Sequence, residues 1–107
     1  MTNKVVYNDC FGGFSISYAC AKRMAELGNK EAQSMLEDTT DRFYGYLYDT
    51  TRHDSTLVQA VEELGETASG HAANLRIHEL SGDKYYIDEY DGSETVVEPE
   101  DICWITV

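Results

Sequence analysis

The chain has 107 residues, of which 42% are hydrophobic and 26% are charged, a composition typical of one small folded domain and unlike that of disordered proteins. Twenty acidic residues against eight basic ones give a formal net charge of −12, which disfavours direct binding of nucleic acid. No apolar run has the ~18 residues of a membrane-spanning helix, and the odd number of cysteines without a signal-peptide pattern indicates reduced thiols in the cytoplasm.

The negative charge increases toward the C-terminus. Residues 1–53 carry six basic and seven acidic side chains, whereas residues 81–107 carry one basic and eight acidic side chains. An anionic ligand would therefore approach the first half of the chain. The acidic second half is typical of a solvated surface, and it could also imitate nucleic acid in a basic groove of another protein.

The first predicted elements are a strand and a helix. Residues 3–9, "NKVVYND", are β-branched and short, which favours a strand. Ser17 is a suitable N-cap for a helix from about residue 18 to 27, and Gly28 is a suitable stop after it.

A second short helix and a second strand are expected next. Residues 29–38 favour a helix capped by Asn29. Residues 42–49, "RFYGYLYD", are rich in aromatic side chains and predict a strand interrupted by Gly45.

The clearest helical pattern lies in "HDSTLVQAVEELG", residues 53–65. Leu57, Val58, Val61 and Leu64 fall on one face of a helix that begins at a cap of Asp54 or Ser55 and ends at Gly65.

The pattern of the C-terminal third of the sequence predicts strands. Residues 74–80 alternate between apolar and polar side chains, and Asp91-Gly92 between two strand-like runs is a strong hairpin signal. After Pro99, residues 101–107 alternate again. The whole pattern predicts one α+β domain over residues 1–107, with a mainly antiparallel sheet of about four or five strands and two or three helices packed on one face.

Four separated stretches carry a family resemblance: "VVYNDCFGGFSIS", "RHDSTLVQAVEELGE", "ANLRIHEL" and "IDEYDGSE". Together they resemble a family of small proteins encoded by bacteriophages and prophages, which open on a Tyr-Asn-Asp-Cys-aromatic-Gly-Gly-Phe segment and carry an Asp-Gly hairpin near the end. Ser55 stands where the family's proline is expected, a departure that affects only helix initiation. The resemblance implies a viral accessory role in the host-cell cytoplasm, such as counter-defence, and supplies no catalytic residues.

The opening motif "YNDCFGGFSIS", residues 7–17, is the main candidate site. Paired glycines between a strand and a helix let backbone amides approach a ligand, and a helix N-terminus favours anions. Hydroxyls would add donors, and aromatic rings would stack on a base. The candidate ligand-binding residues of the motif are Tyr7, Asn8, Asp9, Phe11, Gly12, Gly13, Phe14, Ser15 and Ser17. The motif lacks a P-loop lysine, and a Gly-Gly turn anchored by Phe14 and Ile16 explains it equally well.

A second candidate is the "RHD" segment. Arg52 is suited to bidentate phosphate binding, and His53 is suited to donate to an anion. The alternative is that Asp54 caps a helix while Arg52 and His53 are solvated.

Enzymatic and metal-binding functions are weaker interpretations. Cys10, His53 and Asp54 or Asp9 would complete a formal thiol-hydrolase triad, but adjacent residues seldom orient one another as a triad requires. The acidic tail lacks the spacing of an EF-hand loop, and the histidines lack zinc-site spacing. We therefore predict no catalytic residue, no metal and no cofactor.

Two functions remain open. The first is a non-enzymatic protein that binds or sequesters a small phosphorylated, nucleotide-derived ligand between the Gly-Gly and Arg52–His53 loops. The second is an inhibitor whose acidic face binds a host nuclease or defence enzyme by imitating nucleic acid. A homo-oligomer is compatible with either function.

Overall fold

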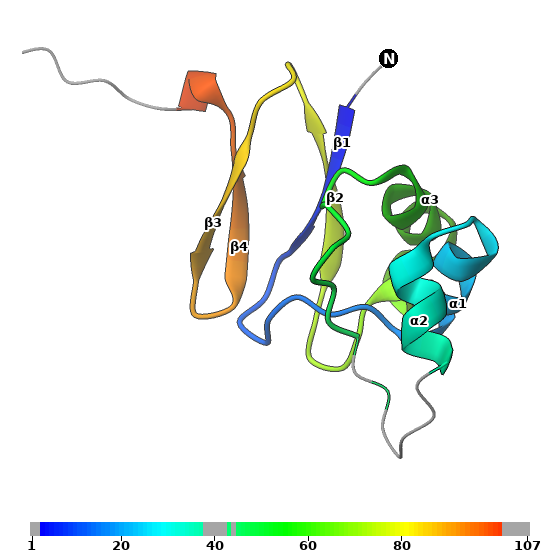
Figure 1. Ribbon diagram of the computed structural model, residues 1–107. Helices are drawn as coiled ribbons and strands as arrows, with labels where there is room; N and C mark the ends of the chain where they lie inside the picture. The colour runs from blue at the N-terminus through cyan, green and yellow to red at the C-terminus, as the bar shows by residue number, and fades with distance from the viewer. Residues whose placement is uncertain (1–2, 38–42, 44, 102–107) are drawn as a thin grey trace, which may run out of the picture.

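The computed structural model describes residues 3–37, 43 and 45–101, and it is an α+β fold of three helices and four strands (Figure 1). The predicted fold class is confirmed. In chain order the elements are β1 (Asn3–Asn8), α1 (Tyr18–Glu26), α2 (Lys30–Glu37), α3 (Ser55–Leu64), β2 (Leu75–Leu80), β3 (Tyr86–Tyr90) and β4 (Ser93–Val97), with 3₁₀ turns at Gly65–Ala68 and Pro99–Asp101.

The β1–β2 pair lies in the middle of the molecule. Figure 1 shows the three helices on one side of this antiparallel pair and the β3–β4 hairpin on the other. Successive side chains of β1 therefore enter different cores: Val6 packs with the helices, and Val5 packs with Leu80 and Val96 against the hairpin. Both valines are fully buried, so this short strand holds the two halves of the fold together.

The predicted helix caps are confirmed. The Ser17 hydroxyl accepts a hydrogen bond from the Cys20 amide at 3.1 Å, and the Asn29 side chain accepts one from the Ala32 amide at 2.9 Å. The Asp54 carboxylate accepts from the amides of the first turn of α3, so Asp54 is the cap of that helix.

The four strands form two separate two-stranded sheets, so the prediction of one sheet is wrong. The cause lies at the free edge of β1. The Val6 amide donates to the carbonyl of Arg52 at 2.8 Å, and the Asn8 amide donates to the carboxylate of Glu94 at 2.9 Å. Because these amides already have partners, β4 lies beside β1 without forming a ladder with it.

Arg52 and Glu94 form a bidentate ion pair at this edge. Guanidinium nitrogens lie 2.5 and 2.8 Å from the two oxygens of the buried Glu94 carboxylate. The guanidinium carbon also lies 3.7 Å from the centroid of the Phe14 ring. The pair thus connects the loop before α3, the hairpin and the opening motif.

Asn8 completes the connection from the end of β1. Its fully buried side chain donates to the carbonyls of Cys10 and Gly92, both at 2.8 Å, and accepts from the Asn74 amide at 2.8 Å. The first residues of the motif are therefore fixed to the hairpin turn and to the loop before β2.

The strand predicted over residues 42–49 is wrong for the part that is described. Arg42 and Tyr44 lie outside the described residues, and the others are irregular. The Glu31 carboxylate accepts hydrogen bonds from the successive amides of Tyr48, Asp49 and Thr50 at 2.7 to 3.0 Å, which removes them from any ladder. Partial burial favours a higher pKa for Glu31, but these hydrogen bonds outweigh it and lower that pKa.

The predicted hairpin is confirmed. Asp91 and Gly92 both have positive φ angles, 51° and 90°, as a two-residue turn between twisted antiparallel strands requires. The alternating pattern predicted over 101–107 lies outside the described residues from position 102 onward.

A second buried carboxylate fixes the other end of the hairpin. Glu98 accepts hydrogen bonds from His78 at 2.9 Å and from the Ser81 amide at 2.7 Å. These bonds, first the one from His78, lower the pKa of Glu98 below its usual value.

Removing the cation from the Arg52–Glu94 pair tests its structural role. We expect Arg52→Met to lower the free energy of unfolding by about 3 kcal/mol, because it leaves a buried carboxylate without its cation. Lys4→Met is the matched control, because it breaks a more exposed ion pair, with Glu62, which contributes little to stability. Urea unfolding measures both, and equal losses would contradict the assignment.

The lowered pKa of Glu98 predicts a pH dependence. Its stabilising contribution is complete above the unfolded-state pKa of about 4.5 and is lost as the pH falls through the lower folded-state value. Glu98→Gln is therefore expected to be less stable than the parent protein at pH 7 and to approach it below pH about 4. Urea unfolding from pH 7 to 3 measures this difference, with the exposed Glu66→Gln as control; a pH-independent difference would be inconsistent with this role.

Candidate functional site

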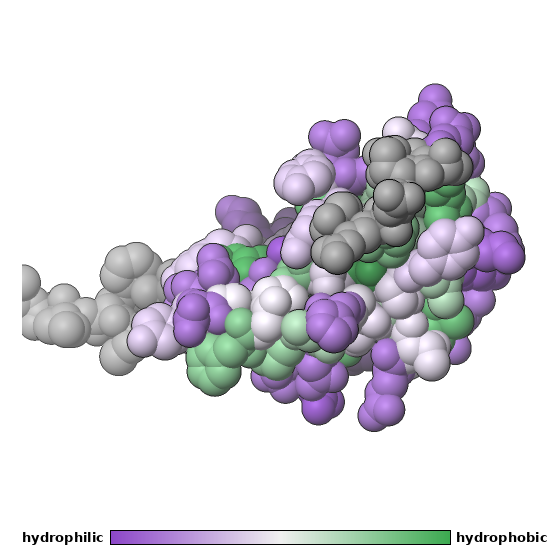
Figure 2. Space-filling model, turned by 90° about the horizontal axis from the view of Figure 1, so that it is seen from below, coloured by the Kyte–Doolittle hydropathy of each residue, from purple (hydrophilic) through white to green (hydrophobic). Residues whose placement is uncertain are grey.

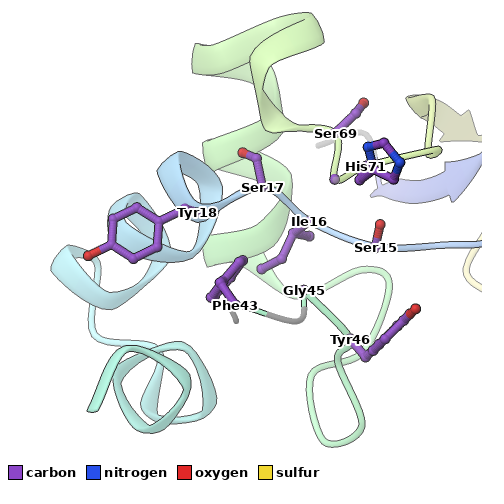
Figure 3. Close-up of a pocket in the computed structure, with 10 residues that line it drawn as sticks. Ser15, Ile16, Ser17, Tyr18, Phe43, Gly45, Tyr46, Ser69 and His71 are labelled. Atoms are coloured by element: carbon purple, nitrogen blue, oxygen red, sulfur yellow. The ribbon is translucent and has the colours of Figure 1, made fainter. Parts of the chain in front are cut away.

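An open cleft of about 450 Å³ lies at the start of α1 (Figure 3). Three chain segments that are distant in sequence contribute to it, and each brings polar or aromatic side chains. The lining residues are Ser15, Ile16, Ser17, Tyr18, Phe43, Gly45, Tyr46, Ser69, Gly70 and His71.

Two glycines allow these segments to lie close together. A Cβ atom on Gly45 would lie 1.8 Å from the carbonyl oxygen of Ile16, and one on Gly70 would lie 2.3 Å from the Ser15 hydroxyl. The Ile16 amide also donates to the Gly45 carbonyl at 2.8 Å, and the Gly70 amide donates to the Ser15 carbonyl at 3.0 Å. The segment that follows the Gly-Gly pair is therefore held between two walls, as Figure 3 shows.

Ser15 is the most informative side chain of the cleft. It is only 8% exposed, yet its hydroxyl has no hydrogen-bond partner among the residues that the structure describes. Figure 3 shows the hydroxyl directed to the same side of the segment as His71. A hydroxyl without a protein partner that faces a cleft is available to a ligand.

The N-terminus of α1 opens onto the same space. Ser17 and Tyr18 line the cleft, and the Ser17 hydroxyl is already used, since it donates to the Thr67 carbonyl at 2.5 Å and caps the helix. The amides of Tyr18 and Ala19 have no hydrogen-bond partner within the described ranges. Free first-turn amides and the helix dipole favour an anion at this position.

The electrostatics of the lining agree with this preference. Although the chain has twenty acidic residues, none of the described residues that line the cleft is acidic. His71, which is exposed at the rim, is the one basic side chain among the described lining residues. The cleft is therefore accessible to an anion despite the overall charge.

The structure divides the predicted ligand-binding residues into two groups. Ser15 and Ser17 line the cleft, whereas Asn8 and Arg52 are used within the fold. Asp9 forms an exposed ion pair with Arg76 at 2.8 Å. The cation expected to bind phosphate is thus already occupied by Glu94.

The remaining motif residues pack or face solvent elsewhere. Tyr7 packs against the hairpin core and Phe14 against the helical core, whereas Phe11 is exposed. A Cβ atom on Gly12 would overlap the Ala72 carbonyl oxygen, and Gly13 has a φ of +88°. Both glycines are therefore explained by the loop itself.

The residues of the formal triad are not brought together. The Cys10 thiol donates to the Ala72 carbonyl at 3.0 Å, beyond the end of β1. His53 lies 2.7 Å from the Tyr85 hydroxyl and shares a hollow with Asn3 at the start of the same strand. A hydrolase centred on Cys10 has no geometric support in the described part of the chain.

Several cleft residues were not predicted from the sequence. Tyr46, Ser69 and His71 come from segments that carry no binding motif. The available signals were the glycines beside them: Gly45 interrupts an aromatic run, and Gly70 precedes His71 in a loop of small residues.

No protein-family model, curated protein or solved structure matches this chain. Within residues 3–37, 43 and 45–101, no group of three or more histidine, cysteine or acidic side chains is placed to hold a metal ion. No helix of the described chain combines the length and apolar character needed to cross a membrane.

Substituting Gly45 tests how the cleft is built. Gly45→Ala would force the 45–46 segment away from the Ile16 carbonyl, and we expect it to lower the free energy of unfolding by about 2 kcal/mol or more. Gly82→Ala is the matched control, because a Cβ atom there meets nothing within 4 Å. Thermal and urea unfolding compare the two variants, and a neutral Gly45→Ala would mean that the close approach is not required.

Proposed function

We propose that the protein is a small non-enzymatic accessory protein of phage type that binds a phosphorylated, nucleotide-derived ligand in the cleft at the start of α1. The observation that carries the proposal is that Ser15, whose hydroxyl has no hydrogen-bond partner among the described residues, lines the same cleft as Ser17 and Tyr18 at the N-terminus of α1. The phage-type role is based on the sequence resemblance, and sequestration of the ligand in the host cytoplasm would follow from binding without turnover.

The phosphate would bind at the helix end of the cleft. The Ser15 hydroxyl can donate one hydrogen bond, and the free amide of Tyr18, which also lines the cleft, can donate another. His71 can add a charge-assisted bond when it is protonated. These donors replace the P-loop lysine that the motif lacks.

The base or sugar would bind against aromatic side chains. Tyr18 and Phe43 form an edge-to-face pair with ring centroids 5.4 Å apart, and Tyr46 lines the same cleft. Base stacking on such rings is worth about 1–3 kcal/mol per base. The volume of about 450 Å³ is within the range of about 300–1,000 Å³ that is usual for small-molecule sites.

Adenosine monophosphate and adenosine are suitable probes, because they differ only in the phosphate. We expect AMP to bind more tightly than adenosine, and Ser15→Ala to lower the affinity for AMP about tenfold, since a hydrogen bond to a charged group is worth about 1.5–3 kcal/mol. Isothermal titration calorimetry measures both affinities.

Ser34→Ala, an exposed serine of α2, is the matched control and should bind AMP like the parent protein. Equal affinities for AMP and adenosine, or an unchanged affinity in Ser15→Ala, would exclude the proposed phosphate position. The same variants should leave the affinity for adenosine nearly unchanged, which separates the phosphate contacts from the stacking contacts.

A further inference from the structure

A second surface combines exposed aromatic side chains with acidic ones at the β3–β4 hairpin. We define the hairpin patch as Phe11, Tyr86, Asp88, Tyr90 and Asp91. The three aromatic side chains are 68%, 54% and 78% exposed in sequence order, although large aromatic residues are usually buried at least in part.

The strand period places most of the patch on one face. Ile87 of β3 packs into the hairpin core with Val96, so the alternate side chains Tyr86, Asp88 and Tyr90 lie on the opposite, outer face. The patch therefore follows the full length of β3, and no described strand pairs with the outer edge of β3.

The backbone of Phe11, near the start of the sequence, lies against the hairpin turn at the Tyr90–Asp91 end of the patch. A Cβ atom on Gly92 would lie 2.5 Å from the Phe11 carbonyl oxygen, so the Gly-Gly loop lies directly against the hairpin turn. Figure 2 shows this end of the molecule from below, with hydrophilic and hydrophobic side chains intermixed on the surface. The opening motif thus contributes to two separate surfaces, the cleft through Ser15 and the patch through Phe11.

The patch carries negative charge without a neutralising partner. Asp88 and Asp91 are exposed and form no ion pair with any described residue. Lys84 is the one basic side chain of the described segment 81–101, which holds eight acidic ones. Two of these, Glu94 and Glu98, pair with Arg52 and His78, and the other six form no ion pair with any described residue, so the segment that carries the tyrosines keeps a strong negative charge.

We infer that the hairpin patch docks onto an arginine-bearing surface of another protein. Arginine satisfies both features of the patch, because its guanidinium stacks on tyrosine and phenylalanine rings and pairs with carboxylates. Charge complementarity favours a basic partner, and it disfavours a second copy of this chain, whose net charge is −12. The inference is independent of ligand binding in the cleft.

Peptides of nine arginines and of nine lysines are the probes, titrated into the ¹⁵N-labelled full chain at low salt. We expect the arginine peptide to bind at least about threefold more tightly than the lysine peptide, with shift changes centred on residues 86–92 and 11. Phe11→Ser combined with Tyr90→Ser should remove this preference, whereas Tyr48→Ser, at another exposed tyrosine, should keep it.

A second pair of variants tests the charge. Asp88→Asn with Asp91→Asn should weaken binding of the arginine peptide at least about threefold, and Glu37→Gln with Glu66→Gln, which removes the same charge elsewhere, should weaken it less. Asparagine tolerates the positive φ of position 91, so the turn is retained.

Three results would overturn the inference: equal affinities for the two peptides, shift changes spread over the acidic surface as a whole, or equal effects of the two charge variants. Because the wild-type shift map alone distinguishes a hairpin site from a diffuse one, the test does not depend on any variant folding normally.

Discussion

The buried carboxylate of Glu94 fixes the hairpin to the edge of β1. Glu94 accepts hydrogen bonds from the Asn8 amide and from both terminal nitrogens of Arg52, so it occupies the edge of β1 where a further strand would otherwise pair. The apolar contacts at this interface are few, with Val5, Leu80 and Val96 as its buried members. A small apolar core of this kind benefits from directional bonds that fix its geometry. The location of the Gly-Gly loop, and hence of both candidate surfaces, follows from this arrangement.

The opening motif therefore has two roles that divide along its length. Its first residues, including Asn8 and Gly12, are used in contacts with the hairpin turn and with the loop before β2. Its last residues, from Ser15 onward, form the floor of the cleft and the cap of α1. The structural-turn interpretation therefore describes the first half of the motif, and the ligand site that we propose lies at the second half. The proposed ligand then depends on hydroxyl and amide donors and not on Arg52.

The sequence predicted those features that have local causes. The caps of all three helices and the Asp91-Gly92 turn were identified correctly, because each depends on residues within a few positions of one another. The division into two sheets and the pairing of Arg52 with Glu94 were not predictable in this way, because Glu94 lies 86 positions from Asn8 and 42 from Arg52. The irregular conformation around Gly45 also depends on residues distant in sequence. Its contacts with Ile16 and Glu31 outweigh a strand-like composition.

The central claim is that the second half of the motif, and not the first, faces the ligand. A ¹⁵N NMR titration of the full chain with AMP tests it most directly, because backbone amides of both halves are observed in one experiment. We expect shift changes concentrated in residues 15–19, 45–46 and 69–71, with residues 10–13 and 52–53 nearly unaffected. Changes centred on the Gly-Gly pair and on Arg52 and His53, or no saturable change at millimolar AMP, would contradict the claim.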